Sequence, residues 1–214
     1  MALWRDNAVA GIAGTDPRSH AERQPLEAVA WLAGRGVTLR DIDTFVIVAG
    51  PGSFTGLRVG VAAVQGWAFA TGRPVAAVPT LDAVVYSIGD VASAGAVIVP
   101  CVDGHRGEVF FGVWRNGAPV IEASVGRPED VIAAARAAAA GAPIVVAGDG
   151  AAKYADVWTA AGWSIVTPLM TLAEAAVRLA AGGRVPSGPP HATRPIYVRR
   201  PDAVIVRERA ARLP

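Results

Sequence analysis

Residues 45–58 read Phe-Val-Ile-Val-Ala-Gly-Pro-Gly-Ser-Phe-Thr-Gly-Leu-Arg, and this stretch decides the fold. The apolar, β-branched run at 45–49 predicts a strand of a parallel sheet, buried on both faces. The glycines and proline at 50–52 end the strand. Ser53 or Thr55 then caps a helix, because a side-chain oxygen at that position accepts a hydrogen bond from a backbone N–H of the first turn.

The helix that follows, residues 56–71, is apolar on almost every side. Arg58 and Gln65 are the strongly polar residues of its interior. A helix that is apolar all round needs cover all round. One sheet covers one side of a helix, so we expect a second polypeptide to cover another side.

The glycine-rich loop ahead of this helix is also a candidate anion site, because backbone N–H groups at a helix N-terminus attract negative charge. Gly50, Gly52 and Ser53 are therefore candidates for binding a nucleotide or another anion. The loop matches neither the P-loop, nor the dinucleotide fingerprint, nor the nucleophile elbow, so a tight strand-to-helix turn is the alternative interpretation. Asp149, in a second Gly-Asp-Gly turn at 148–150, is a further candidate.

The composition is that of a folded protein with a sizeable core. The chain has 214 residues, of which 52% are hydrophobic and 18% are charged. This length fits one large domain or two small ones. No apolar run approaches the roughly 20 residues that a membrane span needs. Cys101 is the one cysteine, which excludes an internal disulfide and favours a reducing, cytoplasmic location.

Positive charge gathers at the carboxyl end. Residues 191–214 hold arginines at 194, 199, 200, 207, 209 and 212 against Asp202 and Glu208, a local +4 in a chain of net charge +2. Such a segment either contacts RNA phosphates or an acidic protein surface, or is a solvated end. Separately, the turn at 103–108 carries Asp103, His105 and Glu108, whose spacing matches no standard metal site. We expect no metal.

Strands and helices alternate along the first part of the chain, which is typical of an α/β sheet. A hairpin at 2–13 comes first. The Ser-His-Ala-Glu sequence at 19–22 has the form of a capping box and predicts a helix from Ser19 to Gly34. The small, flexible segment 89–95 predicts the boundary between residues 1–92 and residues 93–190, with the tail 191–214 packing back on the first part.

The second part is predicted to hold two antiparallel strands, 96–102 and 108–115, and a further strand at 144–147. Its predicted helices are 128–140, 151–161 and 172–181. The Gly/Pro-rich segment 182–190 is expected to be a connector.

The string Gly-Pro-Gly-Ser-Phe-Thr-Gly-Leu-Arg at 50–58, with the apolar helix and the Pro-Val-Ala-Ala-Val-Pro-Thr-Leu sequence at 74–81, resembles the TsaB (YeaZ) family. Shorter similarities lie at 19–23, 103–108 and 195–199. The resemblance covers nearly the whole chain in the right order. It implies the actin-like, sugar-kinase-like (ASKHA) α/β fold with two related lobes.

The resemblance also implies a function. Proteins of this family are regarded as non-catalytic partners of TsaD, which transfers a threonylcarbamoyl group to the adenosine beside the anticodon of tRNAs. They pair with TsaD, or with themselves as a homodimer, through the first two helices. TsaE, an ATPase, joins the complex, so ATP at the complex interface and an indirect contact with tRNA are expected.

By this resemblance the docking face comprises the helix after Ser19 and the helix from Gly56. Glycines and alanine would let a partner helix approach closely, and the larger side chains would supply apolar contact. The expected partner-binding residues are Ser19, Glu22, Leu26, Ser53, Phe54, Gly56, Leu57, Gly60, Val61, Ala63 and Val64.

The sequence departs from the family at its beginning. The family opens with a strand that ends in an Ala-Ile-Asp-Thr-like turn ahead of the hairpin, and Met1 falls where the hairpin begins. We therefore expect a missing first strand of about a dozen residues and a reading frame that extends upstream. Two alternatives stay open: an ATP-dependent phosphotransferase or peptidase of the same fold, in which Asp149 would hold metal, and a tRNA-binding module that uses the arginine-rich tail.

Overall fold

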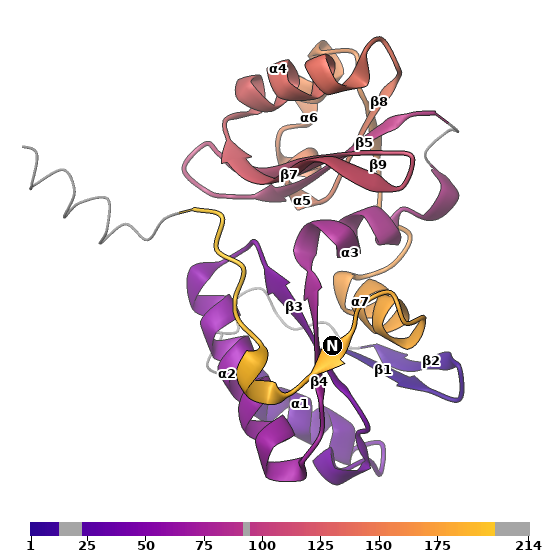
Figure 1. The fold of residues 1–214 in the computed structure, drawn as a ribbon, viewed down its shortest axis with the longest axis vertical. Coiled ribbons are helices and arrows are strands. Elements are labelled where there is room, and N and C mark those ends of the chain that lie inside the picture. The colour runs from indigo at the N-terminus through magenta and orange to yellow at the C-terminus, as the bar shows by residue number, and fades with distance from the viewer. Residues whose placement is uncertain (13–22, 92–94, 200–214) are drawn as a thin grey trace, which may run out of the picture.

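Two α/β lobes form the protein in a computed structural model that describes residues 1–12, 23–91 and 95–199 (Figure 1). The mixed α/β architecture with two lobes confirms the predicted fold class. The first lobe contains β1 (Ala2–Arg5), β2 (Ala8–Ile12), α1 (Gln24–Ala33), η1 (Leu39–Asp41), β3 (Phe45–Gly50), α2 (Phe54–Thr71), β4 (Val75–Pro79) and α3 (Thr80–Ser87). The second contains β5 (Val97–Asp103), β6 (Val109–Arg115), β7 (Ala118–Gly126), α4 (Pro128–Ala139), β8 (Ile144–Ala147), α5 (Asp149–Lys153), α6 (Ala155–Ala160) and β9 (Ser164–Val166).

The stretch at 45–58 forms the strand–turn–helix unit that its sequence predicts. β3 pairs in parallel with β4. Ser53 is the cap of α2, since its hydroxyl oxygen accepts a hydrogen bond from the Gly56 N–H at 3.3 Å. The helix ends at Gly72, whose φ of 70° lies in the left-handed region that glycine adopts without strain. Local sequence signals therefore fix both ends of α2.

The strands of the first lobe form two separate sheets. One has the order β10–β4–β3, where β10 is Ser187–Gly188, and the other is the β1–β2 hairpin. β3 therefore lies at an edge of its sheet, and within the described ranges no strand joins it to the hairpin.

Two elements from late in the chain return to the first lobe. α7 (Leu172–Ala181) packs against α3, β1 and β3, and β10 pairs antiparallel with β4. The sequence division had assigned both to residues 93–190. The apolar face of α7, which includes Ala175, Ala176 and Leu179, packs with Val46, Val48 and Val78. Burial of this face holds α7 on the first lobe.

The second lobe is a mixed sheet in the order β7–β6–β5–β8–β9. The predicted antiparallel pair is confirmed as β5 and β6. α4 and α6 pack over the sheet, where Trp158 and Trp163 stack with ring centroids 5.5 Å apart. β7 and β9 were not predicted; β7 alternates little in burial, with four exposed residues, five half-buried ones and none that is buried.

α1 begins at Gln24 and not at Ser19 as predicted. Pro25 lies in its first turn, the position where the missing proline N–H costs no helix hydrogen bond. Arg23 occupies the cap position and makes no side-chain capping bond. Ser19 and Glu22 lie outside the described residues.

The lobes meet across α3, where Leu81 and Val84, with Ile88 directly after the helix, pack with Phe110 and Trp114 of β6. A segment that we call the strap, residues 189–199, also connects them: it runs beside α2 and then reaches the second lobe (Figure 1). In the parts of the chain that the structure describes, no helix has both the length and the apolar character to cross a membrane.

Candidate protein-binding face

The buried side of α2 holds the helix on its own sheet. Leu57, Val61, Val64 and Ala68 recur at helical spacing and form this side. Val61 is only 3% exposed. These side chains already pack against the lobe's own core, so they offer little surface for the partner contact that was predicted for Leu57, Val61 and Val64.

Gly60 likewise serves the internal packing of α2. A Cβ at this position would lie 3.3 Å from Cδ1 of Ile47 on β3, so glycine permits close approach of helix and sheet. Ala63 is half-buried and lines the same side of the helix, toward α1. Part of the surface of both residues is therefore used within the lobe, and their contact with a partner helix stays a prediction. Gly56 is half-buried beside its capping residue Ser53.

A different side of α2 faces outward. Phe69 is 85% exposed, and Ala62, Gly66 and Ala70 are exposed with it. A Cβ added at Gly66 would meet no atom within 4 Å. The sequence does contain a pattern that indicates this side: Ala62, Gly66 and Ala70 recur every four residues and therefore lie on one side of the helix. The larger apolar residues, which are buried, were given more weight when the partner contacts were predicted, so this pattern was missed.

α1 presents a matching apolar stripe. Leu26 is 74% exposed and Val29 is 39% exposed, with Ala30 and Ala33 exposed beside them. Their spacing of three and four residues places them on one side of the helix. Leu26, which was predicted to bind a partner, is thus accessible, and its exposed surface continues along α1.

α1 and α2 contact one another and lie on the same side of the lobe (Figure 1). We call the exposed apolar residues and the glycine of these two helices the outer face: Leu26, Val29, Ala30, Ala33, Ala62, Gly66, Phe69 and Ala70. None of these side chains is charged or polar. Covering one large apolar side chain is worth about 1.5–3 kcal/mol, so a partner that covered Leu26 and Phe69 would gain substantially.

An aromatic cluster stands at the amino end of α2. The rings of Phe54 and Tyr197 have centroids 5.0 Å apart, and the guanidinium of Arg58 lies 4.8 Å from the Phe54 centroid. Phe54 is 42% exposed. Because Tyr197 belongs to the strap, this cluster ties the strap to the helix beside the outer face.

The strap fills the space beside the candidate anion loop. Gly50 has a φ of 118°, and a Cβ there would lie 2.5 Å from the Ile196 carbonyl oxygen. The Ile196 N–H donates to the Ala49 carbonyl at 2.7 Å. Glycine at position 50 is thus required for the close approach of the strap, which gives the loop a structural role without an anion. Gly52 is half-buried.

Asp149 lies in the other lobe, where its carboxylate accepts hydrogen bonds from the Asp103 N–H at 2.9 Å and the Gly150 N–H at 2.8 Å. The first of these bonds joins the end of β5 to the start of α5, which follows β8. Asp103 in turn accepts two hydrogen bonds from the Lys153 ammonium, at 2.8 and 2.9 Å. Burial raises the pKa of Asp103, but the bonds from Lys153 and from the His105 N–H outweigh it and hold the pKa below its usual value.

The acidic side chains of the 103–108 turn form ion pairs with other residues of the protein. Glu108 pairs with Arg199 of the strap, which also donates to the Gly104 carbonyl at 2.7 Å. Arg194 donates to the Thr193 carbonyl at 2.9 Å. Two of the tail's arginines therefore bind the protein itself. Among the described residues, no group of three or more His, Cys, Asp or Glu side chains could hold a metal.

Comparison with known proteins gives consistent results. The family model described as "TsaD: tRNA N6-adenosine threonylcarbamoyltransferase" matches residues 12–177. An uncharacterized protein of Mycobacterium tuberculosis is 37% identical over 128 residues, which is 60% of this chain and 58% of that protein. The tRNA threonylcarbamoyladenosine biosynthesis protein TsaB of Escherichia coli is 32% identical over 117 residues, 54% of this chain and 50% of that protein.

The chain thus spans between 50% and 58% of the length of these relatives. A solved structure of a Pseudomonas aeruginosa protein with similarity to the peptidase YEAZ superposes with a TM-score of 0.71 at 26% identity, and covers 92% of this chain and 93% of that one. A second, titled YeaZ from the same organism, gives a TM-score of 0.66 at 25% identity. The chain therefore belongs to the TsaD family of proteins, in its TsaB (YeaZ) group.

Proposed function

We propose that the protein is a non-catalytic subunit in the biosynthesis of threonylcarbamoyladenosine in tRNA, and that it binds a TsaD-like transferase through the outer face. The observation that carries the proposal is the outer face itself, an uncharged surface on two adjacent helices with Phe69 85% exposed. The names of the E. coli and Bacillus subtilis relatives support the pathway.

Helix-on-helix docking suits the composition of this surface. Small residues on α2 let another helix approach closely, and Leu26, Val29 and Phe69 supply large apolar contacts at its ends. A homodimer would use the same surface, so self-association and binding of the transferase would exclude one another.

The test uses the TsaD-like subunit from the same organism and the variants Ala62→Asp and Phe69→Asp of this protein. Co-purification shows whether the two proteins form a complex, and a titration measures the Kd. Both positions are exposed, so the isolated fold should keep its thermal midpoint. A charge placed in a desolvated interface should weaken binding by about 3 kcal/mol or more, which is at least roughly a hundredfold in Kd. Threonylcarbamoyladenosine formed in the reconstituted reaction should fall with it.

The matched control is Val120→Asp on β7, a 52% exposed apolar position in the second lobe. It should bind the transferase as the parent does. Wild-type affinity in both outer-face variants would refute the assignment of the face. A TsaE-like ATPase and ATP are further proposed members of the assembly, and adding each to the titration shows whether it tightens the complex.

A further inference from the structure

The strap runs beside α2 (Figure 1) and borders the outer face on one side. The Gln65 amide of α2 donates to the carbonyls of Pro190 and Thr193 in the strap, at 2.9 and 3.0 Å. Ala63, which lines an inner cavity together with α1, stands two positions before Gln65 and therefore on nearly the opposite side of the helix. α2 thus lies between α1 and the strap, so a partner that covers α2 from outside also meets the strap.

The edge of the outer face beside the strap is positively charged. Arg58 and Arg194 are both exposed. The Arg58 guanidinium lies 4.8 Å from the centroid of the Phe54 ring. Arg58 precedes Ala62 of the outer face by four residues, which places both on one side of α2. Within the described parts of the chain neither arginine pairs with a carboxylate, so both charges are available to another molecule.

Carboxylates are scarce around these two charges. Along the described residues of α1, α2 and the strap the one carboxylate is Glu27, which is half-buried on α1. A second copy of this chain would bring the same arginines and the same single carboxylate to the contact. Charges across an interface are arranged so that positive meets negative, so a partner with acidic residues fits this edge better than a second copy does.

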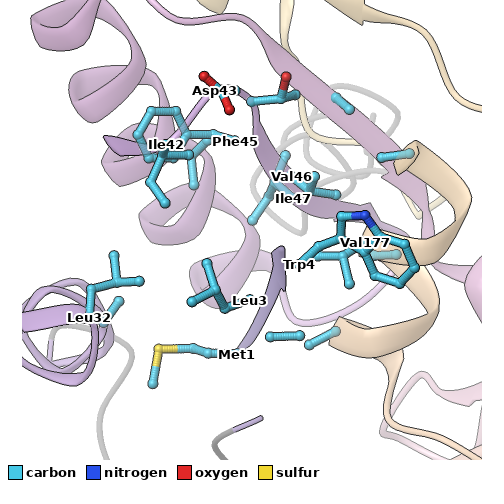
Figure 2. Close-up of a pocket in the computed structure, with 18 of the residues that line it drawn as sticks. Met1, Leu3, Trp4, Leu32, Ile42, Asp43, Phe45, Val46, Ile47 and Val177 are labelled. Atoms are coloured by element: carbon cyan, nitrogen blue, oxygen red, sulfur yellow. The ribbon is translucent and has the colours of Figure 1, made fainter. Parts of the chain in front are cut away.

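The opposite edge of the outer face is apolar. It consists of Leu26 and Val29 of α1, which are 74% and 39% exposed. On the inner side of α1, Leu32 lines a cavity of about 890 Å³ that lies between the helix and β3 (Figure 2), so the two sides of α1 serve different contacts. The outer face therefore changes from apolar beside α1 to basic beside the strap.

We infer, on the basis of the proposed docking of a TsaD-like transferase, that the partner presents carboxylates to the strap side of the outer face and that Arg58 and Arg194 recognise them. Phe54 orients Arg58, because the negative face of an aromatic ring attracts a guanidinium. Apolar contact along α1 holds the complex together. The two arginines, at the rim of the contact, speed association and disfavour partners that lack acidic residues.

The test is a titration of the parent protein and of Arg58→Glu with the TsaD-like subunit from the same organism, at low and high salt. Replacing an attraction at the rim by a repulsion should weaken binding about tenfold at about 50 mM salt, chiefly through slower association. Salt screens exposed charges, so the two proteins should bind alike at about 0.5 M salt.

Three further variants separate local recognition from net charge. Arg58→Gln removes the charge without reversing it, and Arg194→Gln does the same while keeping a donor for the Thr193 carbonyl; each should weaken binding about threefold at low salt. The matched control is Arg115→Glu, which changes the net charge as Arg58→Glu does, at an exposed position of the second lobe. It should bind as the parent does.

The outcomes distinguish this inference from the proposed function. Parent-like association of Arg58→Glu at low salt, together with disrupted binding by Ala62→Asp, overturns the inference and leaves the proposed function intact. Parent-like binding by both variants overturns the proposed function as well. Equal weakening by Arg58→Glu and Arg115→Glu also contradicts the inference, because it traces the effect to net charge and not to the strap side of the outer face.

Discussion

Gln65 is the residue that anchors the strap to α2, and its replacement by methionine tests the strap's role. Its side-chain amide donates to the Pro190 carbonyl at 2.9 Å and to the Thr193 carbonyl at 3.0 Å. Methionine has a similar length but no donor. Each bond is worth about 1 kcal/mol net, and both carbonyls keep another donor, the Arg194 guanidinium on Thr193 and the Thr193 N–H on Pro190, so Gln65→Met should lower the free energy of unfolding by about 1–2 kcal/mol.

Urea denaturation measures this loss, and hydrogen exchange locates it. The amide of Ile196, which is bonded to Ala49 on the far side of the strap, should exchange faster in Gln65→Met. The control is Gly66→Ala, one residue along the same helix in open space, which should stabilise the helix by about 0.5–1 kcal/mol. A change below about 0.5 kcal/mol in Gln65→Met with unaltered exchange at Ile196 would refute the anchoring role.

Three further predictions concern the lobes themselves. Leu81→Ala removes a 1% exposed side chain at the lobe junction and should destabilise the protein by about 2–5 kcal/mol in urea denaturation. Gly148→Ala should be destabilising by about 3 kcal/mol or more, since φ is 107° and the new Cβ would lie 2.2 Å from the Cys101 carbonyl oxygen; unchanged stability would contradict this. Because the folded-state pKa of Asp103 is lowered, its contribution to stability is present above the unfolded value near pH 4 and lost as pH falls through the folded value; Lys153→Gln should flatten that pH dependence, and an unchanged acid-unfolding profile would disprove it.

α2 illustrates how far sequence alone reaches. Its ends follow from local chemistry: Ser53 supplies a capping oxygen and Gly72 accepts a left-handed backbone. Its pervasive apolar character predicted more than one covered side. Which side faces the lobe's own sheet is set by the position of β3 and β4 in space, and the helix spacing alone left that choice open. The partner contacts were therefore predicted on Val61 and its neighbours, whereas the accessible positions are Ala62, Gly66 and Phe69.

The same division between local and distant contacts runs through the whole chain. Short-range signals determined the strand–helix alternation, the first hairpin, the antiparallel pair in the second lobe and membership of the family. Only the tertiary structure decided that α7 returns to the first lobe, that the strap fills the space beside Gly50, and that Asp149 joins the end of β5 to the start of α5. These contacts link residues far apart in sequence, and their free energy comes from the burial of surfaces that no local pattern pairs with one another.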